Sequence, residues 1–196
     1  MAAIERALVA GLGRVITAYQ NTPLTMTDGR LVSFHRLIFG GLFRESDGAG
    51  RFRQPHEPTE FRIPVLRNDR WRMATAHGAA PESVQEELAV TFDEWNAWSA
   101  GARAARSVEL ANVTLHVSKL YTGILRVHPF VDGNHRAGYL SSAAALTSFA
   151  LPVVEFETAE ELRAHDRAVG AAADPRRGDP EPFARLLEQR LRLAHP

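Results

Sequence analysis

Apolar residues recur every three or four positions along most of the chain, which is the spacing of one face of an α-helix. The clearest stripe lies in residues 106–127 and consists of Leu110, Val113, Val117, Leu120 and Ile124. A similar stripe near the N-terminus consists of Ile4, Leu8, Leu12, Val15 and Tyr19. Further helices are predicted over residues 31–43, 81–98 and 133–149, from the capping-box pattern at 158–161, and from Asp179-Pro180 onward.

One segment departs from the helical spacing. Residues 63–67 and 70–74 are rich in strand-forming side chains and flank Asn68-Asp69, a pattern typical of a short β-hairpin. Pro64 lacks an N–H, so its strand belongs at an edge. The pattern therefore predicts an all-α, mostly helical bundle with one short β-hairpin.

Length and composition narrow the class of protein. A chain of 196 residues fits a single domain with a sizeable core. Because Lys plus Arg (23) equals Asp plus Glu (23), no overall field favours nucleic acid or a membrane surface. The chain has no Cys, no secretory signal pattern and no apolar run long enough to span a bilayer. We expect a cytoplasmic protein that binds neither nucleic acid nor membrane.

The loop between the two central helices carries the candidate chemistry, in the run His128-Pro129-Phe130-Val131-Asp132-Gly133-Asn134-His135-Arg136. Pro129 disfavours helical geometry at His128, so the first helix should end there. Free amides and a positive dipole at the start of the next helix attract an anion, and Gly133 lets a phosphate approach. Asp132 is placed to hold Mg²⁺ beside that phosphate, His128 suits a general base, and Arg136 can reach a phosphate.

These residues resemble the signature of the Fic family, whose superfamily includes the Doc toxins. The signature reads His-Pro-Phe-x-Asp/Glu-Gly-Asn-Gly-Arg-x-x-Arg, and this chain reads HPFVDGNHRAGY. The resemblance implies transfer of AMP from ATP, or of another NMP from its triphosphate, to a Ser, Thr or Tyr hydroxyl of a target protein. It implies that His128 deprotonates the hydroxyl, that Asp132 binds Mg²⁺, that Gly133 and Asn134 form the anion hole, and that Arg136 binds the phosphates.

The resemblance reaches beyond the motif, from about residue 30 to about residue 150. It includes Phe34-His35-Arg36-Leu37-Ile38-Phe39-Gly40 and Gly50-Arg51-Phe52-Arg53. We interpret residues 1–196 as a single Fic-like domain with C-terminal helices over 158–195. In this family a hairpin flap holds the target segment by strand addition. By that resemblance the docking residues are Val65, Leu66, Trp71 and Met73.

Two positions differ from the signature. His135 replaces the usual Gly and can add a donor to a phosphate, and Tyr139 replaces the second Arg. In Doc-like relatives the first of these positions is Lys, and the γ-phosphate is transferred instead. The second Arg is the usual partner of an inhibitory glutamate, supplied by the chain or by an antitoxin. An inhibitory partner is therefore expected to act differently here, if one exists.

Three alternatives stay open beside AMP transfer. One is a Doc-like phosphotransferase, and another is a degenerate domain that binds nucleotide or a partner without turnover. The third, ranked last, is a transition-metal site formed by His128, Asp132 and His135.

Six arginines surround the expected hairpin, with acidic residues between them. We interpret them as a solvated surface, with a preference for an acidic target as the alternative. They are Arg51, Arg53, Arg62, Arg67, Arg70 and Arg72.

Overall fold

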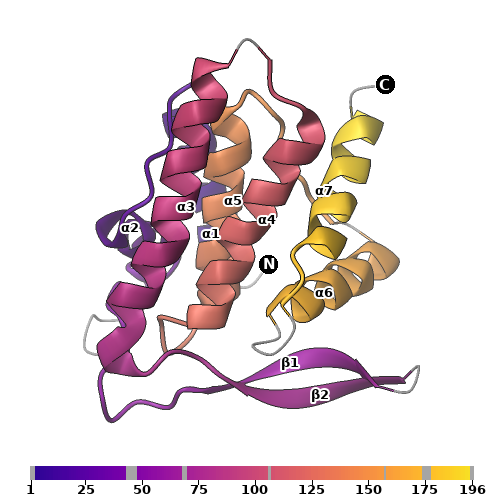
Figure 1. Cartoon of the computed structure of the whole chain (residues 1–196). Coiled ribbons are helices and arrows are strands. Elements are labelled where there is room, and N and C mark those ends of the chain that lie inside the picture. The colour runs from indigo at the N-terminus through magenta and orange to yellow at the C-terminus, as the bar shows by residue number, and fades with distance from the viewer. Residues whose placement is uncertain are drawn as a thin grey trace.

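A computed structural model describes residues 3–42, 48–67, 70–105, 107–156, 158–173 and 178–194. Within these ranges the chain forms a helical bundle and one two-stranded antiparallel sheet (Figure 1), which confirms the predicted fold class. The helices are α1 (Ala3–Tyr19), α2 (Asp28–Phe39), α3 (Val84–Ala104), α4 (Leu110–Val127), α5 (Asn134–Ser148), α6 (Ala159–Ala173) and α7 (Glu181–Ala194). The strands are β1 (Glu60–Arg67) and β2 (Arg70–His77), and a 3₁₀ turn (Pro81–Ser83) precedes α3.

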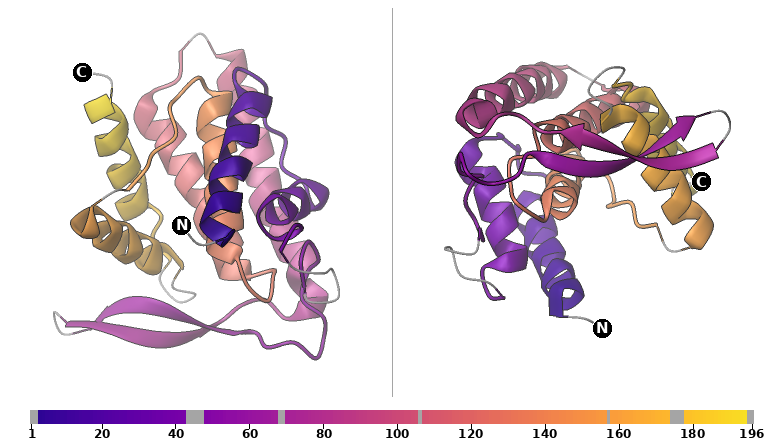
Figure 2. Two further views of the ribbon diagram at one scale, coloured as in Figure 1. Left: turned by 180° about the vertical axis from the view of Figure 1, so that it is seen from behind. Right: turned by 90° about the horizontal axis from the view of Figure 1, so that it is seen from below.

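Helix α5 is the centre of the bundle, with α4, α1 and α2 packed around it (Figures 1 and 2). Its small residues Ala143, Ala144 and Ala145 are buried, as expected for a helix covered on nearly all sides. At Gly138 a β-carbon would lie 2.5 Å from the Tyr121 ring, so the absent side chain lets α4 approach closely. Within the described ranges, no helix has the length and apolar character needed to cross a bilayer.

The predicted stripes form the inner faces of their helices. In α4, Val113, Val117, Leu120 and Ile124 are buried in one continuous core. In α1, Val15 and Tyr19 are buried, and the residues of its first turns are partly buried against the same core.

Local capping explains where several helices begin. The Thr158 N–H donates to Glu161, and the Glu161 N–H donates to the Thr158 hydroxyl, which confirms the capping box before α6. The Asp179 carboxylate accepts from the Glu181 N–H at 3.0 Å and caps α7. The Thr27 hydroxyl caps α2 through the Arg30 N–H, so this helix begins at Asp28 rather than at 31.

Other helix boundaries also differ from the prediction. Helix α4 begins at Leu110 rather than at 106, because the chain is extended at Glu109. Helix α3 continues past 98 to Ala104, through a stretch of Ser, Ala, Gly and Arg that contains no Pro. Helix α2 ends at Phe39 rather than at 43, and residue 43 lies outside the described ranges.

The hairpin crosses the lower end of the bundle in Figure 1, near the end of α4 and beneath α6. Its strands are antiparallel, with Pro64 opposite Met73 and Glu60 opposite His77. Both strands are longer than predicted, and the Asn68-Asp69 turn lies outside the described residues. Strand β1 packs against α6, so the hairpin is joined to the C-terminal helices.

Candidate functional site

The chain reverses direction between α4 and α5 through a tight loop, residues 128–133. His128 caps the end of α4 in the left-handed region, at φ 52°, and its N–H donates to the Ile124 carbonyl. Gly133 precedes α5, also with positive φ, at 80°. These two turns place the His128 ring beside the first turn of α5.

The His128 ring is half-buried and stacked on Phe61 from β1. The two ring centroids are 4.0 Å apart and the planes differ by 7°. The Nδ1 atom is buried, and no described group meets hydrogen-bond geometry with it, although the Leu125 carbonyl acts on the ring.

The environment of His128 favours the neutral ring. Burial first, then the charge of Arg53 and the neighbouring His135, lower its pKa to about 4, against smaller opposing effects of the Leu125 carbonyl and Asp132. A neutral imidazole at neutral pH has a free lone pair for a proton.

The interior of the loop is closed by Asn134. Its side-chain oxygen accepts from the Phe130 N–H at 2.9 Å, and its side-chain nitrogen donates to the Phe130 carbonyl at 2.8 Å. Because the Asn134 side chain is buried and occupied in this way, its contact with an anion would come from the backbone N–H.

Gly133 lies against a stack of rings. The His35 ring lies between Phe39 and Phe130, at centroid distances of 4.6 and 4.0 Å. A β-carbon on Gly133 would collide with the Phe39 ring, so this position requires glycine for space as well as for its positive φ.

His35 also holds the loop backbone. Its Nδ1 accepts from the Gly50 N–H at 2.9 Å, so the neutral ring carries its proton on Nε2 and donates to the Asp132 carbonyl, also at 2.9 Å. Burial lowers the pKa of His35, which favours this neutral form. His35 is therefore a core group with both ring nitrogens hydrogen-bonded.

Asp132 presents its carboxylate to solvent at the edge of the loop. Its Oδ1 accepts from the Gly133 N–H at 2.6 Å, and the second oxygen remains for another ligand. Mg²⁺ is commonly bound by one or two carboxylates together with substrate phosphates, and one exposed carboxylate fits that pattern.

The transition-metal interpretation of His128, Asp132 and His135 is not supported. Among the residues described, no three His, Cys, Asp or Glu side chains are grouped so that they could hold a metal ion.

Arg136 and His135 extend from the first turn of α5. The Arg136 guanidinium carbon lies 5.7 Å from the Phe39 ring centroid, in a half-buried position. His135 is exposed as a residue, and its Nδ1 lies 3.4 Å from the Tyr121 hydroxyl. Desolvation and the neighbouring His165 lower the pKa of His135, so its ring is mostly neutral at pH 7.

A cavity of about 250 Å³ adjoins both histidines. Apolar walls come from both strands, from α4 and from α6, with one carboxylate, that of Asp166. The lining residues include Phe61, Met73, Leu125, His128, His135 and Asp166.

Tyr139 does not face this cavity. Its hydroxyl donates to the Val154 carbonyl at 3.2 Å, and burial together with the charge of Glu155 raises the pKa of Tyr139 to about 12. The side chain is therefore a packing group with a satisfied hydroxyl.

The predicted docking residues of the hairpin are only partly described. The backbone places Val65, Leu66 and Trp71 in the strands, but their side chains lie outside the described part of the structure. Met73 is 56% exposed and lines the cavity beside His128.

Two residues of the site were not singled out in the sequence, and the burial of a third was not predicted. Phe61 and Asp166 reach the cavity from β1 and α6, and no local pattern marks either of them. Arg53 was interpreted as part of a solvated surface, which is wrong, because it is 2% exposed and bonded to the site. The signal that could have indicated a role in the site was its position in the run Gly50-Arg51-Phe52-Arg53, which resembles the family.

Comparison with known proteins identifies the family. The sequence model of the Fic/DOC family matches residues 25–146, which is more than half of the chain. No functionally curated protein matches the chain in sequence.

Three solved structures share the fold. A Fic domain-containing signaling protein from Bacteroides thetaiotaomicron has a TM-score of 0.64 at 19% identity, over 96% of this chain and 67% of that one. A fragment of Fic-1 from C. elegans has a TM-score of 0.64 at 19% identity, over 99% of this chain and 51% of that one. BepC from Bartonella tribocorum, solved with bound AMPPNP, has a TM-score of 0.59 at 16% identity, over 95% and 85%.

The chain spans about half of the C. elegans fragment and two thirds of the Bacteroides protein. At these identities the structures establish the fold, and the family match covers the loop, all of α4 and α5 as far as residue 146. The chain belongs to the Fic/DOC family.

Proposed function

We propose that this protein is an enzyme that transfers AMP, or another nucleoside monophosphate, from a nucleoside triphosphate to a hydroxyl of a target protein. The observation that carries the proposal is the neutral His128 ring, which borders a cavity beside the first turn of α5. A base and a phosphate cradle at one place are what nucleotidyl transfer to a hydroxyl requires.

In this reaction Nε2 of His128 takes the proton of the target hydroxyl. The hydroxyl oxygen then bonds to the α-phosphorus, the bond from that phosphorus to the bridging oxygen breaks, and pyrophosphate leaves. We assign the proton of the resting ring to Nδ1, on the buried side near the Leu125 carbonyl. That assignment leaves the Nε2 lone pair as the base.

The first turn of α5 would hold the phosphates. The backbone N–H groups of Asn134, His135 and Arg136 precede the first intrahelical bond, which runs from Ala137 to the Gly133 carbonyl, so they remain available for an anion. The Arg136 guanidinium adds a charged donor at this end of the helix.

Asp132 is the residue that would hold Mg²⁺ with the phosphates. The metal would neutralise phosphate charge, and the protein would supply one carboxylate oxygen. The nucleotide as co-substrate is supported by the related fold of BepC, which was solved with AMPPNP.

The hairpin supports a protein substrate. Met73 of β2 is exposed and borders the cavity at His128, so a strand added to this edge would bring its side chains close to the base. The target chemistry is a Ser, Thr or Tyr hydroxyl in an extended segment.

Intact-mass spectrometry of target proteins tests the proposal. Incubation with ATP and Mg²⁺ should add one AMP per site, and addition should fail in EDTA. His128→Ala should lower the rate by about 10²–10⁴ because the positioned base is lost. Arg126→Ala, an exposed substitution on the same helix turn, is the matched control. Full activity of a folded His128→Ala variant would exclude His128 as the base.

A second candidate is transfer of the γ-phosphate to the same hydroxyl. It is favoured by one observation, that His135 borders the cavity at a position where glycine would leave space. The mass experiment separates the two candidates, because this reaction adds one phosphate. We expect His135→Gly to raise the rate of AMP addition. A variant that instead loses AMP addition would make His135 part of the native binding site.

A further inference from the structure

Arg53 is a buried arginine whose guanidinium is bonded to backbone carbonyls and to no carboxylate among the residues that the structure describes. It is 2% exposed and lies in the segment between α2 and β1. Burial lowers the pKa of Arg53, and the nearby Glu57 opposes that effect, but a guanidinium keeps its charge in proteins. A buried charge of this kind requires a full set of hydrogen bonds.

Backbone carbonyls satisfy the Arg53 side chain. Its Nε donates to the His128 carbonyl at 2.7 Å, and its Nη2 donates to Ala79 at 2.7 Å and to Val127 at 3.3 Å. Its Nη1 donates to the Pro58 carbonyl at 3.2 Å. One guanidinium therefore joins the end of α4 to both ends of the hairpin.

The backbone around Arg53 reinforces the same junction. The Arg53 N–H donates to the Pro129 carbonyl, and the Ala79 N–H donates to the Val127 carbonyl. At Gly78 a β-carbon would lie 2.7 Å from the His128 β-carbon and 2.9 Å from Arg53 Nη2. The segment that follows the hairpin at Gly78 thus packs directly on His128.

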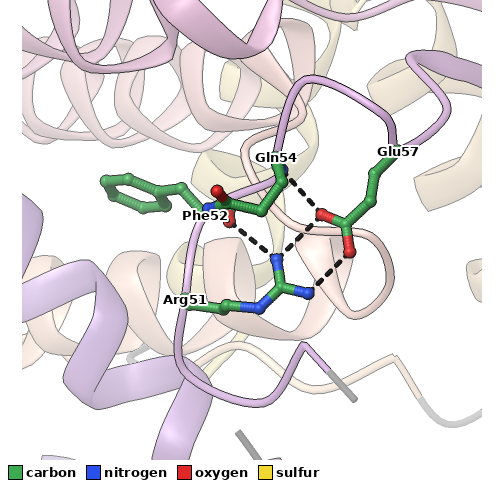
Figure 3. A network of polar contacts seen from close by, with 4 residues as sticks. All are labelled: Arg51, Phe52, Gln54 and Glu57. Carbon is green, nitrogen blue, oxygen red and sulfur yellow. Dashed lines mark hydrogen bonds and ion pairs between the residues drawn. The ribbon is translucent and has the colours of Figure 1, made fainter. Parts of the chain in front are cut away.

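A second arginine stiffens the segment that carries Arg53 (Figure 3). Arg51 makes a bidentate pair with Glu57, at 2.8 and 2.6 Å, and the Gln54 N–H donates to the same carboxylate. The Arg51 hydrogen bonds lower the pKa of Glu57 to about 2. This pair braces the turn at residues 51–57.

We propose that Arg53 is the positioning residue of His128. Its buried guanidinium holds the His128 backbone and connects it to the segments at the two ends of the hairpin. The fixed carbonyls keep His128 in its left-handed conformation, so the ring stays on Phe61 and points to the cavity. The charge opposes protonation of the ring, which is the second-largest cause of the low His128 pKa. The role in catalysis rests on the proposed function, whereas the effect on the ring does not.

Titration of the histidine rings by NMR tests the proposal without turnover. The His128 signal is identified by its loss in His128→Gln. In Arg53→Gln, which removes the charge, the His128 pKa should rise by about 1. In Arg53→Lys, which keeps the charge but loses the planar fork, it should stay near the wild-type value.

Arg51→Gln is the matched control, because it removes an arginine from the same segment whose bidentate partner is Glu57 rather than a carbonyl of the loop. It should leave the His128 titration unchanged. An unchanged His128 pKa in Arg53→Gln, or an equal rise in Arg51→Gln, would overturn the proposal.

The wild type provides a measurement that needs no variant to fold. A buried Nε–H donating to the His128 carbonyl should exchange slowly with solvent, whereas rapid exchange of Arg53 Nε–H would contradict the proposal. If AMP transfer is detected, Arg53→Lys should lower kcat by about 10- to 100-fold. The pH at which kcat falls on the acidic side should change little, because the charge near His128 is kept. If no transfer is detected, the NMR outcome still decides the role of Arg53.

Discussion

His128 joins an uncommon backbone conformation to an uncommon ring environment. Its positive φ is costly for a residue with a β-carbon, and the surrounding hydrogen bonds offset that cost. The ring is stacked, partly buried and near a buried arginine. It therefore stays neutral in the pH range in which an exposed histidine would begin to protonate. A single residue therefore couples backbone geometry to proton affinity.

We predict that stability falls as the pH is lowered from about 6.5 to about 4. The His128 pKa is lowered to about 4 in the folded state, against about 6.5 in the unfolded chain, so the unfolded chain binds more protons in that window. Burial lowers the pKa of His35 and His165 too, which adds in the same direction. Urea unfolding across this range measures the effect, and His128→Gln should reduce it. Constant stability between pH 7 and pH 4 would contradict the buried neutral rings.

We predict that Gly133→Ala destabilises the protein and weakens nucleotide binding. The new β-carbon would meet the Phe39 ring at a positive φ, and such strain costs about 1–3 kcal/mol. Urea unfolding and calorimetry with a nonhydrolysable triphosphate and Mg²⁺ measure the two effects. Gly101→Ala, in open space on α3, is the control and should be neutral or stabilising.

At the scale of elements, the hairpin has two different edges. Strand β1 packs against α6, while β2 packs mainly against β1 among the described elements. Pro64 has no N–H to donate, and it lies opposite Met73. This fits a non-hydrogen-bonded pair of the antiparallel ladder, in which the N–H of each residue points away from the other strand. On β2 that direction is the open edge.

We predict that Met73→Pro impairs target modification more than nucleotide binding. It removes an N–H from the open edge of β2 and keeps the pairing within the hairpin. Met73→Leu keeps the N–H and the apolar side chain and should behave like the wild type. Target modification by intact mass and nucleotide affinity by calorimetry separate the two roles. Equal loss of both would mean that the hairpin serves the fold alone.

At the scale of the whole molecule, one continuous core supports the site. It contains residues from α1 to α7, with α5 in the middle. The loop at 128–133 lies between two helices of this core, so the precision of the site depends on their packing.

We predict that Leu140→Ala destabilises the whole bundle by about 2–5 kcal/mol. Leu140 is fully buried in α5, and its Cδ1 lies close to Gly11 of α1, so truncation leaves a cavity between two helices. Leu193→Ala, at a position 67% exposed, should change stability by less than about 0.5 kcal/mol. Chemical unfolding of both variants measures the difference, and similar values would mean that α5 is not central to stability.

The sequence determined the helical bundle, the hairpin, the capping box before α6 and the family. These follow from local signals, because helix faces, caps and turns depend on residues a few positions apart. The loop motif was readable for the same reason, since its residues lie within nine positions.

Only the tertiary structure decided which distant residues reach the motif. Asp166 and Phe61 border its cavity from α6 and β1, and no spacing in the chain marks them. Arg53 is the clearest example. From the sequence, an arginine beside a hairpin is expected to be solvated, but here it is buried and hydrogen-bonded to carbonyls up to 75 residues away in the chain. Burial and electrostatic environment arise from contacts between distant segments, so the sequence marked His128 as a candidate and the fold set the proton affinity of its ring.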